Sequence, residues 1–183
     1  MKTWTRAVIF VAIFLCTTGF DQASKDWART LPTSPPGCST ADLAAHHCIG
    51  VPQPVIEGTW DWQLAMNDGV AFSTFTDVGG AQIILSILAA IALVSIGVVA
   101  KRTRPEEHLK RIALAAIAGG ALGNLIDRIR DGAVTDFVRW RVGDHIWPLF
   151  NVADAALLIG VFLLLIDSML AKRKRSPPAM LGA

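Results

Sequence analysis

Two aspartates stand in apolar surroundings, where a carboxylate is costly to keep charged. Asp136 lies within the segment Val134–Val138, and Asp154 is the single charge between Leu149 and Ile166. A charged residue in or near a membrane span marks a functional site by default. Two carboxylates held close together cannot both ionise easily, so they share a proton. One then acts as general base on a water and the other as general acid toward a carbonyl. The pair predicts hydrolysis with no metal, no cofactor and no covalent intermediate.

Three further polar residues close an apolar run in the second half of the chain. Asn124 and Asp127 are three residues apart, and Asn124 and Arg128 are four apart, so all three can point to one side of a helix. Asn151 precedes Asp154 by three residues in the same way. These groups could position the two aspartates. The alternative interpretation is a packing motif that caps and joins helices.

A charged pair stands near the N-terminus. Asp21 and Lys25 are four residues apart on one helical face, so they can form an ion pair. Taken alone, they could equally be an ordinary helix-end contact at the membrane surface. Gly119 and Gly123 form a small-xxx-small pair that lets another helix approach closely.

Four apolar segments must carry these residues. Hydrophobic residues make up 52% of the chain and charged residues 17%, against roughly 25% charged in average soluble domains. A helix needs about 20 mostly apolar residues to cross the hydrocarbon core. The sequence therefore predicts a bundle of four membrane spans, at about 4–22, 79–100, 110–127 and 147–168.

The stretch between the first two spans, about 26–78, is a long outer loop. Its first part is rich in proline and predicts irregular structure. Its second part, 58–75, alternates apolar and polar residues, which predicts one or two short strands at the membrane surface. We expect a single membrane domain over residues 1–175 and a disordered cytoplasmic tail over 176–183.

Basic residues are distributed unevenly. With the N-terminus in the cytoplasm, the inner segments 1–6, 101–111 and 171–183 hold 11 of the 17 basic residues. This bias predicts that both termini are cytoplasmic and that the aspartates lie near the outer face. The outer side nevertheless holds arginines that call for aspartate or lipid head-group partners: Arg128, Arg130, Arg139 and Arg141. The net charge of +2 gives no indication of nucleic-acid binding.

Three cysteines are present. Cys16 lies inside the first span, where we expect a small packing residue. Cys38 and Cys48 lie in the outer loop, and a disulfide or two free thiols are the favoured interpretations. A zinc site that adds His46 and His47 is an alternative, but the spacing matches no zinc pattern.

Other kinds of enzyme find no support in the sequence. It contains neither a G-x-S-x-G elbow nor an H-E-x-x-H motif, and the loop serines and histidines have no triad partners. It also lacks the Gly-x-Gly-Asp motif of presenilin-like and prepilin peptidases. The remaining rivals are a small proton-linked transporter, with Asp127, Asp136 and Asp154 as a relay, and a non-catalytic membrane scaffold.

Five short motifs, in order over about residues 4–170, resemble those of the lipoprotein signal peptidase (signal peptidase II) family. Each is weak alone, and together they are highly specific. They are Asp21–Lys25, Asn67–Ser73, Gly123–Arg128, Gly132–Phe137 and Phe150–Asp154.

This resemblance implies a fold, an activity and a site. The fold is an all-α membrane protein, a four-helix transmembrane bundle with a small extracytoplasmic β-sheet between spans 1 and 2. The family's catalytic aspartates correspond to Asp136 and Asp154. Positions that support the pair, the substrate or the fold correspond to Asn124, Asp127, Arg128, Asn151, Asp21, Lys25, Asn67 and Gly69.

The resemblance also implies the substrate and the inhibitor. The family removes signal peptides from prolipoproteins by cutting before a diacylglyceryl-modified cysteine, at the outer face of the bacterial inner membrane. The peptide antibiotic globomycin occupies the site, and we expect a monomer that also contacts membrane lipid. Two departures stand out, namely the long proline-rich loop and Thr135, at a position where valine is common.

Overall fold

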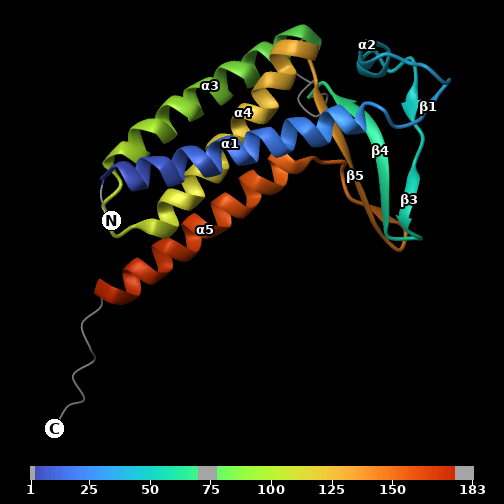
Figure 1. Ribbon diagram of the computed structural model, residues 1–183. Coiled ribbons are helices and arrows are strands. Elements are labelled where there is room, and N and C mark those ends of the chain that lie inside the picture. The colour runs from blue at the N-terminus through green and yellow to red at the C-terminus, as the bar shows by residue number, and fades with distance from the viewer. Residues whose placement is uncertain (1–2, 70–77, 176–183) are drawn as a thin grey trace.

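A computed structural model describes residues 3–69 and 78–175 of the chain and shows long helices side by side with a sheet at one end (Figure 1). Within these residues, four helices are long and apolar enough to cross a membrane, which makes the chain a multi-pass membrane protein. Their bounds are α1 Thr3–Ala28, α3 Val78–Arg102, α4 His108–Asp131 and α5 Val152–Arg175. The tail expected over 176–183 lies outside the described residues.

The helices differ from the expected spans at their polar ends. α1 continues past residue 22 to Ala28, because the polar residues of its last turns are buried against α4. α4 ends at Asp131, and Gly132 follows with the left-handed φ of 69° that commonly closes a helix. α5 begins at Val152, later than the expected start near residue 147, since Asn151 caps its first turn.

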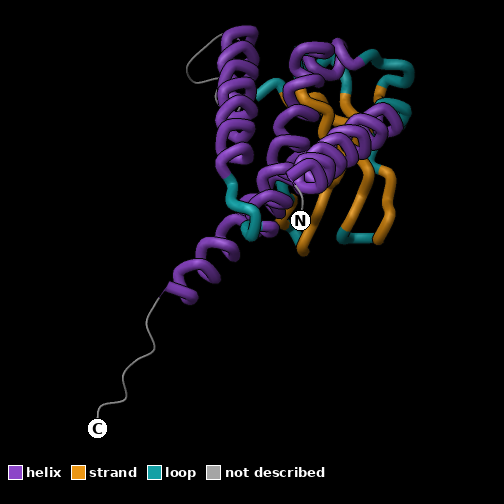
Figure 2. Tube along the Cα trace, turned by 60° about the vertical axis from the view of Figure 1, so that its left-hand side comes forward, coloured by secondary structure: helices purple, strands orange, loops and turns teal. Residues whose placement is uncertain are grey.

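α4 is the central helix and packs against each of the other three long helices. Small residues allow this close approach. A Cβ added at Gly119 would lie 2.6 Å from the Thr17 side chain of α1, and one added at Gly120 would meet the Ala153 carbonyl of α5. Gly123 likewise faces α1, so the predicted small-xxx-small contact is confirmed. Figure 2 shows α3 at one side of the bundle, apart from the strands.

The helices around α4 present apolar side chains on the side that lipid would surround. α3, for example, exposes Ile83, Ile87 and Ile91, as suits a surface solvated by acyl chains. Cys16 is also exposed on α1. The prediction that it is a small packing residue is therefore wrong, because its side of α1 faces away from the neighbouring helices.

A four-stranded antiparallel sheet covers one end of the bundle, in the order β3-β4-β5-β6. β3 (Gln53–Ile56) and β4 (Trp60–Asn67) come from the loop between α1 and α3, which confirms the expected sheet in that loop. β3 nevertheless lies before the segment 58–75 in which strands were expected, because it pairs with β4 across a short turn. β5 (Val134–Val142) and β6 (His145–Ile146) come from the segment between α4 and α5 and complete it. The sheet thus joins two loops that are far apart in sequence.

The end of α1 is anchored on this sheet by aromatic contacts. The ring of Trp27 lies 5.3 Å from Trp62 of β4 and 6.0 Å from Phe137 of β5. The proline-rich part of the loop forms β1 (Thr33–Ser34), the short helix α2 (Thr40–Ala44) and β2 (Ile49–Gly50). Packing of the α1 end against β4 and β5 places its polar residues beside those of the sheet.

Candidate active site

Asp136 is held by an asparagine on the neighbouring strand. β4 and β5 pair Asn67 with Val134, so Asn67 is a diagonal neighbour of Asp136 on one face of the sheet. Asn67 Nδ2 donates to Asp136 Oδ2 at 3.0 Å, and Asn67 Oδ1 accepts from the Gly69 N–H at 3.0 Å. Gly69 has a φ of 77°, which favours glycine. The turn at Gly69 therefore sets which end of the amide faces Asp136. The rest of this motif, Val70–Ser73, lies outside the described residues.

Asp154 is held in the first turn of α5 by reciprocal capping bonds. The Asp154 N–H donates to Asn151 Oδ1 at 3.0 Å, and the Asn151 N–H donates to Asp154 Oδ2 at 3.2 Å. This capping box turns the carboxylate back toward the start of the helix. The i,i+3 spacing noticed in the sequence therefore has a local structural cause.

Two amide side chains join the carboxylates of Asp136 and Asp154. Asn151 Nδ2 donates to Asp136 Oδ1 at 2.7 Å, and Asn124 Nδ2 donates to Asp154 Oδ1 at 2.9 Å. Asn151 Nδ2 also lies 3.2 Å from Asn124 Oδ1, which closes the connection between the two amides. The structure thus brings together two acids from different elements, with Asn151 fully buried between them.

The surroundings of Asp136 favour its protonated form. Burial, with the nearby charge of Asp154, raises the pKa of Asp136 to about 7, and its side chain is only 2% exposed. The hydrogen bonds from Asn67 and Asn151 act in the opposite direction but are outweighed. A carboxyl group with a pKa close to the working pH is suited to general acid–base chemistry.

Lys25 supplies a positive charge next to Asn124, the amide that contacts Asp154. Its Nζ lies 2.9 Å from Asp21 Oδ2, 3.2 Å from Asp127 Oδ2 and 2.8 Å from Asn124 Oδ1. The predicted pairing of Asp21 with Lys25 is confirmed. The alternative of an ordinary surface contact is wrong, because Lys25, Asp21 and Asp127 have no exposed side-chain surface.

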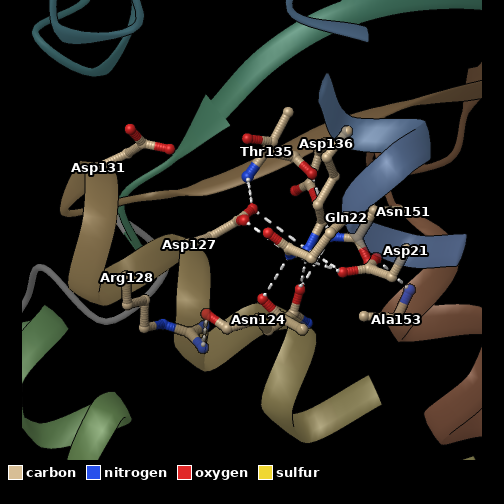
Figure 3. Close-up of polar contacts among 12 residues, drawn as sticks. Asp21, Gln22, Asn124, Asp127, Arg128, Asp131, Thr135, Asp136, Asn151 and Ala153 are labelled. Atoms are coloured by element: carbon tan, nitrogen blue, oxygen red, sulfur yellow. Dashed lines mark hydrogen bonds and ion pairs between the residues drawn. The ribbon is translucent and has the colours of Figure 1, made fainter. Parts of the chain in front are cut away.

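The carboxylates of Asp21 and Asp127 also hold the segments that carry Asp136 and Asp154. Asp21 Oδ1 accepts from the Ala153 N–H at 2.8 Å, one residue before Asp154. Asp127 Oδ2 accepts from the Thr135 N–H at 2.9 Å, one residue before Asp136 (Figure 3). Asp21 therefore fixes the start of α5, and Asp127 fixes β5.

Arg128 lies at the edge of this polar cluster. Its Nη1 donates to the carbonyl oxygen of Asn124 at 3.4 Å, and its charge interacts with those of Asp154, Asp136 and Asp127. The structure thus places Arg128 with the other predicted site residues, although its guanidinium does not form the short contacts that Lys25 makes.

The other arginines that were expected on the outer side pair with aspartates. Arg139 and Arg141 approach Asp61 to 3.8 and 3.3 Å, and the Asp61 side chain is almost fully buried between β4 and β5. Arg130 lies 3.3 Å from Asp26. These contacts favour ion pairing over lipid head groups as the reason for the outer arginines.

Arg29 is a site residue that the sequence interpretation missed. Its Nη2 lies 2.8 Å from Asp131 Oδ2, 2.7 Å from Thr135 Oγ1 and 3.4 Å from Asp127 Oδ1. Its position four residues after Lys25, on the same face of α1, was the available signal. The contact also gives Thr135, the departure noted in the sequence, a partner for its hydroxyl.

Cys38 and Cys48 are joined by a disulfide. This removes both thiols from any zinc site, and no three His, Cys, Asp or Glu residues in the described part of the chain are grouped to hold a metal. The zinc alternative is therefore wrong for these residues. The bond links the two ends of the segment that contains α2, beside the sheet.

Comparisons with known proteins find relatives over most of the chain. A family model described as "Signal peptidase (SPase) II" matches residues 13–170. The chain is 38% identical over 162 residues to the lipoprotein signal peptidase of Xylella fastidiosa (strain 9a5c), covering 86% of each chain. It is 34% identical over 176 residues to that of Xanthomonas euvesicatoria pv. vesicatoria (strain 85-10), covering 94% of this chain and 92% of the relative.

Two solved structures, both described as a bacterial membrane enzyme, share the fold. One aligns with a TM-score of 0.67 at 24% identity and covers 95% of this chain and 94% of the other. The second aligns with a TM-score of 0.64 at 27% identity and covers 86% and 90%. The bundle and its sheet are therefore a fold already seen in bacterial membrane enzymes.

Proposed function

The chain belongs to the signal peptidase II family of aspartic endopeptidases, and from that premise we propose that Asp136 and Asp154 are its catalytic pair. One observation carries the proposal: hydrogen bonds through Asn151 and Asn124 tie together two carboxylates from separate segments. Both acids are thereby directed toward one place, where a water can lie between them.

The two acids divide the chemistry of hydrolysis. Asp154 takes a proton from the water, whose oxygen attacks the scissile carbonyl carbon, and Asp136 gives its proton to the carbonyl oxygen. The raised pKa of Asp136 supports this order, since the group holds a proton near neutral pH. When the tetrahedral intermediate collapses, the carbon–nitrogen bond breaks, the proton held by Asp154 passes to the leaving nitrogen, and one hydroxyl of the intermediate returns a proton to Asp136.

Other residues position the pair. Lys25 balances the two buried carboxylates that hold α5 and β5, and Asn67 orients Asp136. Arg128 supplies a cation at the edge of the site, and we assign it to contacts with the substrate backbone or head group. The reaction as written needs no metal and no cofactor.

The substrates are diacylglyceryl-modified prolipoproteins, cut before the lipidated cysteine. Relatives that cover most of the chain carry the name lipoprotein signal peptidase, which supports this substrate class. The signal peptide enters laterally from the bilayer, and the cysteine's lipid lies between the helices. We place the enzyme in the bacterial inner membrane as one domain over residues 1–175, with both termini cytoplasmic and the site near the outer face. It acts as a monomer, and globomycin inhibits it by occupying the site.

A cleavage assay tests the assignment. Purified wild type, Asp136→Asn and Asp154→Asn are incubated in detergent with a diacylglyceryl-modified prolipoprotein, with and without globomycin and a metal chelator. We expect wild type to show globomycin-sensitive, chelator-resistant cleavage and both variants to lose at least about 1,000-fold in rate. Asp144→Asn, which makes the same charge change in an exposed turn, is the control and should keep full activity.

Three results would contradict the proposal. Turnover near the wild-type rate by either dyad variant would remove that residue from catalysis. Inhibition by the chelator would indicate metal-dependent chemistry. Proton flux through the wild type in liposomes, together with indifference to prolipoprotein, would favour the transporter.

A further inference from the structure

A cavity of about 440 Å³ opens at the end of the bundle away from the sheet. The start of α1, the end of α3 and the start of α4 line it, and Figure 1 shows these three ends together, opposite the strands. Its volume falls in the range of about 300–1,000 Å³ typical of small-molecule sites. None of the groups proposed for catalysis takes part in it.

The residues that line the cavity change from charged to apolar along the axes of α1 and α3. On α1, Arg6 lies one turn before Phe10, and on α3, Lys101 lies one turn after Gly97. Both helices therefore place a cation at the membrane surface and an apolar or small residue one turn deeper. A phospholipid has the same order, with a charged head group at the surface and acyl chains below it.

Arg111 of α4 completes the cavity and has spare hydrogen-bonding capacity. Its side chain is buried, with 7% of the residue exposed, and its Nη2 donates to the carbonyl oxygens of Thr103 at 3.3 Å and Arg104 at 3.0 Å. Its Nη1 is buried and has no hydrogen-bond partner among the described residues. A buried charged donor without an acceptor costs free energy, so an acceptor brought by a ligand would be stabilised there.

The positive charge of the cavity lining indicates that the ligand is anionic. Three of its lining residues are cations, Arg6, Lys101 and Arg111, and none of the described lining residues is acidic. Guanidinium groups match phosphate oxygens well, and basic pockets between membrane helices bind anionic lipid head groups. The apolar wall around Phe10 gives the first carbons of an acyl chain a place beside the head group.

We propose that this cavity is a binding site for an anionic glycerophospholipid of the leaflet opposite the active site. Its phosphate contacts Arg111 and Lys101, and one acyl chain descends along Phe10 and Gly97. The proposal concerns lipid binding alone and does not depend on the assignment of the catalytic pair.

Native mass spectrometry of the purified full chain in detergent tests the site. The protein is titrated with dioleoylphosphatidylglycerol, which is anionic, or dioleoylphosphatidylcholine, which is zwitterionic. We expect the anionic lipid to bind about tenfold more tightly, and Lys101→Gln to weaken it about fivefold. Arg102→Gln is the matched control, since Arg102 is the exposed neighbour of Lys101 but does not line the cavity. It should leave binding unchanged.

Two further variants separate the phosphate contact from the acyl-chain contact. Arg111→Gln should weaken binding of the anionic lipid at least as much as Lys101→Gln does. Should Arg111→Gln fail to fold, Gly97→Leu still decides, because it keeps all three cations. A Cβ added at Gly97 meets no atom within 4 Å, so the position is open to a larger residue, and leucine there would extend into the space proposed for the acyl chain. We expect Gly97→Leu to lose the lipid while cleaving prolipoprotein at the wild-type rate.

The outcomes that would overturn the site are specific. Equal binding of the two lipids would remove the charge argument, and unchanged binding by Gly97→Leu would remove the acyl-chain contact. sn-Glycerol 3-phosphate carries the phosphate without acyl chains. If it displaced the lipid at similar concentration, the cavity would be a site for soluble phosphate esters instead.

Discussion

Asn151 Nδ2 lies 2.7 Å from Asp136 Oδ1, while Oδ1 of the same amide accepts the Asp154 N–H at 3.0 Å. One side chain therefore contacts one acid and caps the helix that carries the other. The two functions can be separated, because a hydroxyl can cap a helix but cannot span the same gap to Asp136.

Substitutions of Asn151 should separate stability from activity. We expect Asn151→Ser to retain the helix cap, with a Tm close to wild type, and to lose on the order of 100-fold in kcat/KM. Asn151→Ala should lose the cap as well and fall by a further ~1 kcal/mol in stability. Thermal unfolding and cleavage rates of the purified variants measure both. A serine variant with full activity would show that the contact between Asn151 and Asp136 is only structural.

The raised pKa of Asp136 predicts a stability that falls as pH rises. The carboxyl group titrates at an ordinary value of 3.8 when unfolded and at about 7 when folded. Between these values the folded state holds a proton that the unfolded state has released. The stability contributed by the protonated group is fully present below pH 3.8 and is lost as pH rises through 7.

Asp136→Asn should remove this dependence, because asparagine resembles the protonated acid and does not titrate. We expect the variant and wild type to have similar Tm values at pH 4. At pH 8 the variant should be the more stable, by on the order of 4 kcal/mol, or roughly 10 °C in Tm. If the Tm of the two proteins changed by the same amount between pH 4 and pH 8, the raised pKa of Asp136 would be contradicted. Wild-type kcat/KM should also fall as pH rises through about 7.

Local spacing in the sequence predicted those contacts of the site that lie within one helix. Asp21 and Lys25 pair as their i,i+4 spacing indicated, and Asn151 and Asp154 form a capping box at i,i+3. Helix geometry fixes such neighbours whatever the rest of the chain does. Four apolar runs likewise identified the four helices, because the bilayer sets their length and composition.

Contacts between distant segments could not be predicted from residue spacing. The approach of Lys25 to Asp127 depends on how α1 and α4 rotate against each other, and that of Asn67 to Asp136 depends on strand register. The hydrogen bond from Arg29 to Thr135 depends on both the helix rotation and the strand register. Neither helix rotation nor register leaves a periodic signal in a single sequence. The resemblance to a known family supplied Lys25, Asp127, Asn67 and Asp136 instead, but it did not supply Arg29.

Removal of the Lys25 charge should destabilise the bundle strongly. Lys25→Met leaves Asp21 and Asp127 buried without their cation, which typically costs about 3–5 kcal/mol or roughly 10 °C in Tm. Lys110→Met is the matched control, since Lys110 forms a partly exposed pair with Glu107 at 3.6 Å, and it should shift Tm by less than roughly 2 °C. Adding Asp21→Asn to Lys25→Met should recover part of the loss, because one of the two uncompensated charges is then gone.

Gly123 is a position on the contact between α1 and α4 where an added methyl group should be poorly tolerated. An added Cβ would collide with the carboxylate of Asp21, which lies against α4 and accepts the Ala153 N–H. Gly123→Ala must therefore push α1 away or displace Asp21, at about 1–3 kcal/mol, and it should lower cleavage as α5 loses its anchor. Gly19→Ala is the control, because a Cβ at Gly19 meets no atom within 4 Å. Alanine is the better helix former, so we expect Gly19→Ala to be neutral or more stable. Equal Tm values and cleavage rates for the two variants would show that α1 and α4 are not in close contact at Gly123.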